Sequence, residues 1–174
     1  GLTQALKDVS VTIDEGEVIG LIGENGSGKS TLSSIISGVY PQSEGELTLD
    51  GKPYKPADTL DAQNHGISMI AQEMGTLPGI KVADNLFIGK EQLFTKHGVV
   101  DRKKMYQEAR KALEKIGIDN IHPEDPIIKY SLEERKLVEV VRALYTNPRI
   151  FIVDETTTAL SQRGRDIIYQ VIKN

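Results

Sequence analysis

A glycine-rich segment near the start of the chain carries the residue types and spacing that point most directly to chemistry. It matches the phosphate-loop pattern G-x-x-x-x-G-K-[ST] without a mismatch and consists of Gly23, Glu24, Asn25, Gly26, Ser27, Gly28, Lys29, Ser30 and Thr31. Glycines let successive backbone N–H groups converge on phosphate oxygens, and the N-terminus of a following helix adds its dipole. We expect Lys29 to reach the β- and γ-phosphates of a nucleotide, Ser30 to ligate Mg²⁺ and Thr31 to hold the α-phosphate. The alternative, a glycine-rich turn without function, is disfavoured by the buried strand predicted before the segment and the helix predicted after it.

A second candidate site lies where an apolar strand ends. Residues 150–153 are all apolar, and Asp154 and Glu155 follow them directly. We expect Asp154 to bind Mg²⁺ through water and Glu155 to polarise the attacking water as a general base. Taken alone, such a pair could be an ordinary solvated helix cap. Together with the glycine-rich segment, it predicts the second half of a nucleotide site.

The elements that must position these residues alternate between strands and helices. Alternating or continuous apolar residues predict strands at 9–13, 18–22, 46–49, 67–70 and 150–153. Helical periodicity predicts helices at 30–36, 82–88, 101–116, 131–145 and from about residue 161. The helix at 101–116 has Asp101 as its expected cap and an apolar stripe formed by Met105, Ala109, Ala112, Leu113 and Ile116. This order indicates an α/β core interrupted between roughly residues 75 and 145 by a mostly helical insertion.

Composition excludes several classes of protein. The 174 residues are 39% hydrophobic, which predicts about one domain with a real core. The formal net charge of −4 argues against a dedicated nucleic-acid binder, which needs a basic surface for phosphates. The absence of cysteine excludes a disulfide scaffold and a thiolate metal site. No run of about 18 apolar residues and no signal pattern occurs, so we expect a soluble, intracellular domain.

Three further features, in their order along the chain, carry a family resemblance. Gln72 follows the strand at 67–70, Ser131 begins a helix well before Asp154 and Glu155, and residues 158–161 (Thr-Ala-Leu-Ser) follow that pair. This order of phosphate loop, glutamine loop, signature helix, acidic strand end and D-loop resembles the ATP-binding-cassette (ABC) ATPases. Within that family, three stretches look like the ATP-binding subunits of ribose- and galactose-type monosaccharide importers, at residues 37–41, 66–73 and 137–144.

The resemblance implies a fold and a set of site residues. The fold would be a phosphate-loop (P-loop) NTPase core with a mixed, mostly parallel sheet flanked by helices, an antiparallel β subdomain and an inserted helical subdomain. Residues 1–174 would form one partial ABC domain, with its ATP-binding core at approximately 1–74 and 146–174 and its helical subdomain at approximately 75–145. The cofactors would be ATP and Mg²⁺. Gln72 would complete the Mg²⁺ ligands beside Ser30 and Asp154 and sense the γ-phosphate, while Ser131 would contact ATP bound by a second cassette.

The resemblance also implies partners and an activity. Hydrolysis of ATP would be coupled to transport through a transmembrane permease, which would contact the segment at roughly 73–89. A second ABC domain, in a head-to-tail dimer or in tandem, would complete the site, and an extracytoplasmic sugar-binding protein would take part indirectly. The chain would lie peripherally at the cytoplasmic face of the cell membrane and bind no nucleic acid. The alternatives are a cassette with a degenerate, mainly regulatory ATP site, a non-transport ABC ATPase, and a small-molecule phosphate-loop kinase, against which the order of Gln72, Ser131 and 158–161 speaks.

The signature segment departs from the family pattern. Where the family has L-S-G-G-Q, this chain has Tyr130, Ser131, Leu132, Glu133 and Glu134. The Glu133 carboxylate would oppose ATP by roughly 3 kcal/mol at about 5 Å and an effective dielectric near 20, which predicts a weakened composite site. Ser131 and Glu134 also fit a capping box, so the serine could simply cap its own helix.

Two smaller departures from the family pattern follow Glu155, and two expected residues are missing near the ends of the chain. Ser161 stands where many members carry aspartate, and Thr156 where proline is usual. No histidine takes the place of the family's switch histidine, and no aromatic residue takes the place that stacks on adenine. The resemblance therefore implies a piece of a longer ATPase, truncated at both ends.

Overall fold

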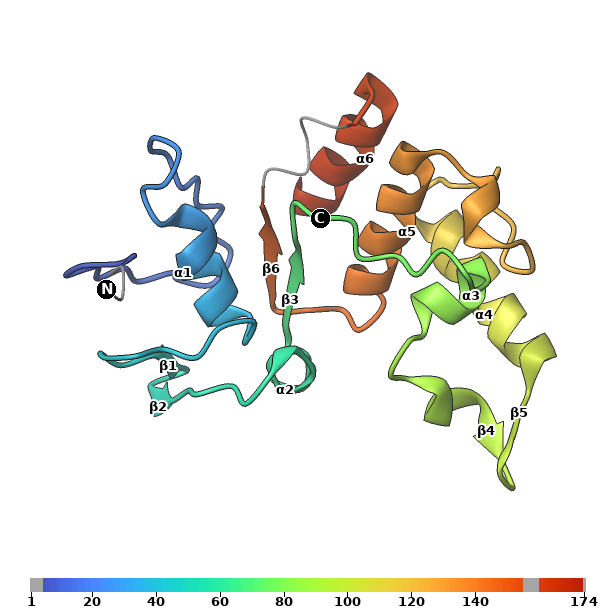
Figure 1. Ribbon diagram of the computed structural model, residues 1–174, viewed down its shortest axis with the longest axis horizontal. Coiled ribbons are helices and arrows are strands. Elements are labelled where there is room, and N and C mark those ends of the chain that lie inside the picture. Colours follow the sequence, from blue (N-terminus) through green and yellow to red (C-terminus); the bar gives the residue numbers. More distant parts are fainter. Residues whose placement is uncertain (1–4, 155–159, 174) are drawn as a thin grey trace.

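The computed structural model describes residues 5–154 and 160–173. A pair of parallel strands lies between a helical part and a part that carries α1 and a small hairpin (Figure 1). In the described residues, the helices are α1 (Lys29–Ile36), α2 (Thr59–Asn64), α3 (Val82–Leu86), α4 (Arg102–Lys115), α5 (Leu132–Leu144) and α6 (Gln162–Lys173), with short 3-10 turns η1 (Glu91–Phe94) and η2 (Ile127–Lys129). The strands in the same residues are β1 (Thr48–Leu49), β2 (Lys52–Pro53), β3 (Ile67–Ile70), β4 (Thr95–Lys96), β5 (Val99–Val100) and β6 (Ile150–Val153).

Strands β3 and β6 form the parallel pair at the centre of the molecule. Ile67 lies opposite Ile150, and Ile70 lies opposite Val153. Side chains from α5 and α6 pack against this pair, where Ile70, Val140, Leu160 and Ile168 form a buried cluster. Both strands run in the same direction, so the residues that follow them leave at one edge of the pair. This edge is where the predicted site residues of both strands must meet.

The helical part has a core of its own, built between α3, α4 and α5. The predicted stripe of α4 is confirmed, because Met105, Ala109 and Leu113 are buried in this core while Ala112 and Ile116 are partly buried against it. The predicted cap is also confirmed, since the Asp101 side chain accepts a hydrogen bond from the Lys104 backbone N–H at 2.9 Å. The hairpin β4–β5 lies at the tip of this part (Figure 1).

The segment after α1 leads into the antiparallel hairpin β1–β2. Gly38 lies two residues after the end of α1. Its φ of 73° favours glycine, and a Cβ there would lie 2.4 Å from the Asp58 carbonyl oxygen. The Tyr54 hydroxyl donates to the Ile36 carbonyl oxygen at 2.9 Å and so fastens the residues after the hairpin to the end of α1. These contacts hold the end of α1 against the segment between β2 and α2.

Two predicted strands are absent from the described structure. Residues 9–13 and 18–22 have no regular secondary structure, and Val18 and Ile22 are 74% and 98% exposed. A hollow of about 1000 Å³ separates Val18 and Ile19 from Phe151 of β6 and from α6. The prediction was wrong because an apolar run supplies the side chains of a buried strand but not the hydrogen-bonding partner that makes it a strand. Within the described residues, no helix is both long and apolar enough to cross a membrane.

Candidate nucleotide-binding site

The phosphate loop leads directly into the N-terminus of α1 and is bound by the first residue of that helix. Lys29 Nζ donates to the carbonyl oxygens of Gly23 and Glu24 at 2.9 and 2.8 Å, so the ammonium group lies against the loop that it follows. Gly28 adopts a φ of 93°, and a Cβ there would come within 2.7 Å of the Ala5 carbonyl oxygen. A phosphate oxygen bound here would compete with two carbonyl groups for the Lys29 ammonium.

The predicted magnesium ligands Ser30 and Asp154 are in contact. The Ser30 hydroxyl, in the first turn of α1, donates to Asp154 Oδ1 at 3.1 Å across 124 positions of sequence. Asp154 directly follows β6, and its backbone N–H donates to the Ile70 carbonyl oxygen of β3 at 3.0 Å. A hydroxyl and a carboxylate are hard oxygen donors of the kind that Mg²⁺ prefers, so this pair fits the ion. The first turn of α1 and the end of β6 therefore converge as the sequence predicts.

Gln72 follows β3 at the same edge of the strand pair. It stands two positions after Ile70, the residue that receives the Asp154 backbone hydrogen bond. The carbonyl groups on either side of it, of Ala71 and Glu73, accept hydrogen bonds from Lys136 Nζ at 2.8 and 3.0 Å. Sequence reasoning missed Lys136, although a lysine between the apolar residues of α5 was a visible signal.

Ser131 is the N-cap of α5, and the capping box with Glu134 is confirmed. The Ser131 backbone N–H and hydroxyl both donate to Glu134 Oε2 at 2.9 Å, and the Glu134 N–H donates back to the Ser131 hydroxyl at 3.3 Å. The contact of Ser131 with ATP stays a prediction. A serine hydroxyl accepts and donates, so its cap and a phosphate are compatible partners.

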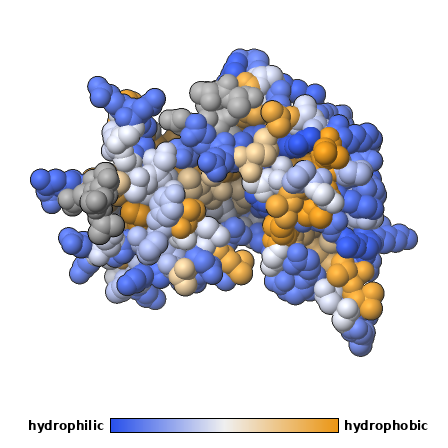
Figure 2. All heavy atoms as spheres, viewed as in Figure 1, coloured by the Kyte–Doolittle hydropathy of each residue, from blue (hydrophilic) through white to orange (hydrophobic). Residues whose placement is uncertain are grey.

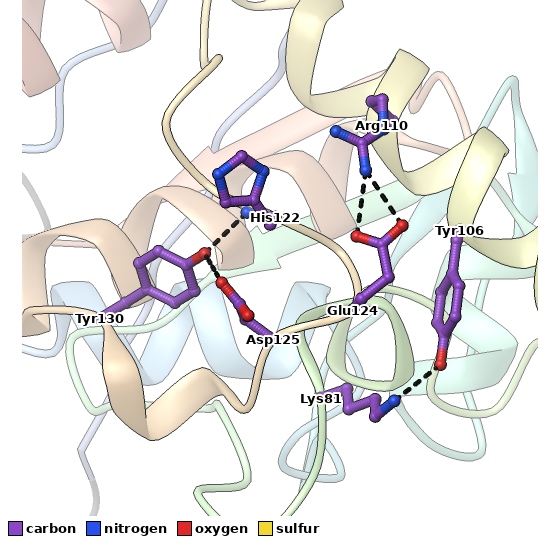
Figure 3. Close-up of polar contacts among 7 residues, drawn as sticks. All are labelled: Lys81, Tyr106, Arg110, His122, Glu124, Asp125 and Tyr130. Carbon is purple, nitrogen blue, oxygen red and sulfur yellow. Dashed lines mark hydrogen bonds and ion pairs between the residues drawn. The ribbon is translucent and has the colours of Figure 1, made fainter.

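The loop before α5 is fixed through Tyr130 (Figure 3). Its hydroxyl donates to Asp125 Oδ2 at 2.8 Å and accepts from the His122 N–H at 2.7 Å. The pKa of Tyr130 is raised, mainly by burial. The pKa of Asp125 is lowered, mainly by the hydrogen bond from Lys129 and to a lesser extent by the one from Tyr130. Two further contacts drawn in Figure 3 hold α4 against the same loop and the start of α3, between Arg110 and Glu124 and between Lys81 and Tyr106.

Glu133 is directed at the start of α6 within its own chain. Its Oε1 accepts hydrogen bonds from the Ser161 backbone N–H at 3.1 Å and from the Ser161 hydroxyl. A Cβ at Gly164 would lie 2.9 Å from the same oxygen, so a small residue in α6 makes room for it. Glu133 and Ser161 are both departures from the family pattern, and they meet. This pair was missed although its two members were each visible in the sequence.

Residues 6–158 match the family model described as ABC transporter. That match covers most of the chain and includes the loop, Gln72, Ser131 and Asp154 of the geometry above. The chain belongs to the ABC transporter family. The predicted catalytic Glu155 and residues 156–159 of this cassette lie outside the described residues.

Curated relatives of the cassette carry the name ribose import ATP-binding protein. The cassette is 39% identical over 172 residues to "Ribose import ATP-binding protein RbsA 2" of Escherichia coli O157:H7 and 41% identical over 170 residues to RbsA of Shouchella clausii. These alignments cover 99% and 98% of the chain but 33% and 34% of the relatives. The chain thus spans about a third of the length of the relatives that it matches.

Solved structures of other cassettes share its fold. The ATP-binding cassette MJ0796, in a dimeric post-hydrolysis state bound to ADP and Pi, aligns with a TM-score of 0.79 and 26% identity over 97% of this chain and 73% of that one. The cassette MJ1267 aligns with a TM-score of 0.78 and 30% identity over 97% and 70% of the two chains. The predicted α/β fold of a P-loop NTPase is confirmed.

Proposed function

We propose that this cassette binds and hydrolyses ATP and that hydrolysis drives the import of a sugar of the ribose type through a membrane permease. The observation that carries the proposal is the contact between the Ser30 hydroxyl and Asp154 Oδ1 at 3.1 Å beside a complete phosphate loop. The curated relatives are named for ribose import, which supports the substrate class.

The residues of the chain divide the chemistry of hydrolysis among themselves. The backbone N–H groups of the loop and the Lys29 ammonium bind the β- and γ-phosphates and orient the terminal phosphoryl group. Ser30, Asp154 and Gln72 would hold Mg²⁺, and the bound ion supplies charge neutralisation on the phosphate oxygens. Glu155 holds the attacking water and accepts its proton. Water adds to the γ-phosphorus, the bond to the β-phosphate oxygen breaks, and ADP and inorganic phosphate are released.

A second cassette completes each site in this proposal. Ser131 caps the N-terminus of α5. The positive end of the helix dipole, together with the Ser131 hydroxyl and nearby N–H groups, would bind the γ-phosphate held by the partner cassette. The dimeric state named for MJ0796 supports this arrangement. The second cassette is either another chain or a tandem domain of the same protein.

The permease would contact a hollow near the glutamine loop. A cavity of about 470 Å³ opens between the segment after Gln72, the end of α1 and α2, with Glu73, Ile88 and Lys90 among its lining residues. Figure 2 shows the surface hollowed between the part that carries α1 and the helical part. A helix end of the permease inserted here would touch the glutamine loop and place the cassette peripherally at the cytoplasmic face. The sugar-binding protein would act on the permease from the other side of the membrane.

The test is ATP turnover and sugar uptake by the intact parent protein, reconstituted with its permease and binding protein in lipid vesicles. We expect ribose to stimulate turnover, Glu155→Gln to abolish it with nucleotide binding retained, and Lys103→Ala, an exposed lysine of α4, to match the wild type. Undiminished turnover in Glu155→Gln would overturn the catalytic assignment. Turnover stimulated by DNA or RNA rather than by sugar and permease would favour a non-transport ATPase.

A further inference from the structure

An ion pair is buried almost completely on α5. The Lys136 ammonium lies 2.8 Å from Glu139 Oε2, and the two side chains are 5% and 4% exposed. Charged side chains are rarely buried to this extent, because removing them from water costs more than the pair alone returns. A buried pair of this kind therefore calls for an explanation beyond stability.

Lys136 uses all of its donors on the glutamine loop and Glu139. An ammonium group has three N–H donors, and those of Lys136 reach Glu139 Oε2, the Ala71 carbonyl oxygen and the Glu73 carbonyl oxygen at 2.8, 2.8 and 3.0 Å. Ala71 and Glu73 are the two neighbours of Gln72. The backbone on both sides of Gln72 is thereby bound to one buried cation.

Two further side chains of α5 bind the next part of the same loop. Glu139 Oε1 accepts a hydrogen bond from the Gly75 backbone N–H, and Arg142 donates to the Gly75 carbonyl oxygen at 3.1 Å. A Cβ at Gly75 would lie 2.9 Å from the Arg142 guanidinium, so the loop backbone passes close to α5. Lys136, Glu139 and Arg142 recur every three positions and line one face of the helix.

We propose that Lys136 is a positioning residue, which with Glu139 holds the glutamine loop on α5 and thereby sets where the Gln72 side chain lies at the nucleotide site. The ion pair places the loop in one position, which an apolar contact at the same place would not do, because carbonyl groups need directed donors. The helix that the signature residue Ser131 caps thus also holds the loop that would contact the nucleotide of its own cassette. This inference rests on the proposed role of Gln72 as a Mg²⁺ ligand.

The first measurement is amide hydrogen exchange on the nucleotide-free parent protein, which reports on the loop independently of activity. We expect Lys136→Met and Glu139→Gln to speed exchange at Gly75 by about tenfold or more while exchange in α4 stays unchanged. The matched control is Lys111→Met, which removes the ion pair with Glu108. That pair has the same three-residue spacing, but its side chains are 70% (Lys111) and 33% (Glu108) exposed. Unchanged exchange at Gly75 in both variants would overturn the proposal.

The second measurement is the Mg²⁺ dependence of ATP turnover in the protein reconstituted with its permease. We expect Lys136→Met to raise the Mg²⁺ concentration for half-maximal turnover by about tenfold, because residues that orient a metal ligand typically affect metal affinity by about that much. Lys136→Arg, which keeps a cationic donor, should bring this concentration part of the way back to the wild-type value. In a Gln72→Ala background the same substitution should add no further change, because both residues act through one ligand. Additive effects would show that Lys136 acts elsewhere and would overturn the proposal.

A variant that fails to fold does not end the test. Lys136→Gln combined with Glu139→Gln removes both buried charges and keeps groups that hydrogen-bond each other, and it should show the same exchange and the same Mg²⁺ shift. If the wild-type protein hydrolyses no ATP, the proposed function fails, and the exchange experiment still decides whether the loop is held by α5.

Discussion

The two segments that should meet the nucleotide are held in opposite ways. The phosphate loop matches its pattern at every position, yet residues 17–27 are exposed and the Lys29 ammonium binds the loop's own carbonyl groups. The signature end of α5 departs from its pattern, yet that helix buries a continuous run of residues, 136–141. Matching a motif and being fixed by packing are therefore separate properties in this chain.

The difference follows from what each segment must do. A phosphate loop binds through backbone N–H groups, and these need a backbone path that glycines permit rather than a packed core. Helix α5 must carry a signature at one end and the glutamine loop along its side, which requires a fixed position. We expect amide hydrogen exchange to be faster in the exposed phosphate loop than in the buried part of α5, because segments with few buried contacts open locally at lower cost.

The largest effect that separates the two segments should come from Lys29→Ala. Loss of charge-assisted hydrogen bonds to the phosphates should weaken nucleotide binding by about 100-fold. The free energy of unfolding should change by less than about 0.5 kcal/mol, since Lys29 has no partner outside its own loop among the hydrogen bonds of the described residues. Titration with a fluorescent nucleotide and urea unfolding of the same sample measure both. A large loss of stability would show that the loop is packed more firmly than its exposure indicates.

The reverse result is expected for Val140→Ala in α5. Val140 is fully buried against Ile70, Leu160 and Ile168, so removing its methyl groups should lower the free energy of unfolding by about 2 kcal/mol. Nucleotide affinity of the folded protein should stay within about twofold of the wild type, because the phosphate loop lies elsewhere. A parallel loss of affinity would mean that the two segments are coupled through β3 and β6.

A smaller effect should come from the pair of Glu133 and Ser161. Glu133→Gly and Ser161→Ala should each lower the free energy of unfolding by about 1 kcal/mol, and the double variant should lose little more, because both remove one contact. Additive losses would show that the two side chains act separately.

ATP turnover of the same variants separates contact from charge. If Glu133→Gly raises turnover and Ser161→Ala does not, the carboxylate opposes nucleotide and the composite site is weakened by its charge. If neither raises it, the contact with Ser161 keeps the carboxylate away from phosphate. Glu133→Gln, which removes the charge and keeps an acceptor, is the matched control.

The sequence predicted those helices and strands whose bounds are determined by neighbouring residues along the chain. The bounds of α1, α4, α5, β3 and β6 were predicted to within two residues, because caps, periodicity and apolar runs determine them. The meeting of Ser30 and Asp154 was predicted because it follows from the family order of motifs.

Other features depend on partners that no local pattern reveals. Residues 9–13 and 18–22 have the composition of strands but no described ladder, because pairing is decided by distant segments. Lys136 and Glu139 interrupt an apolar helix face, and only the fold shows that the glutamine loop supplies their partners. The sequence pattern thus predicted that Ser30 and Asp154 lie close together, and it missed the contacts that Lys136 and Glu139 make along α5.

The smallest effect concerns the loop that leads into the signature. Hydrogen bonds from Lys129 and Tyr130 lower the pKa of Asp125 from its ordinary value of 3.8. A carboxyl group whose pKa is lowered by folding stabilises the protein fully at pH values above its ordinary pKa. This stabilisation is lost as the pH falls below about 4 and through the folded-state pKa. Asp125→Asn should therefore flatten the acid end of the stability curve slightly, as measured by urea unfolding from pH 6 to about pH 2.5.

Lys129→Ala removes the main cause of that pKa shift and should flatten the same part of the curve. The two substitutions together should change it no more than Asp125→Asn alone, because without the carboxylate the ammonium has nothing left to stabilise. If the wild-type curve keeps its full slope in both variants, the loop before the signature contributes nothing to acid stability. The position of α5 would then be stabilised by its buried face alone, and not by the exposed ion pair between Lys129 and Asp125 in the loop that precedes it.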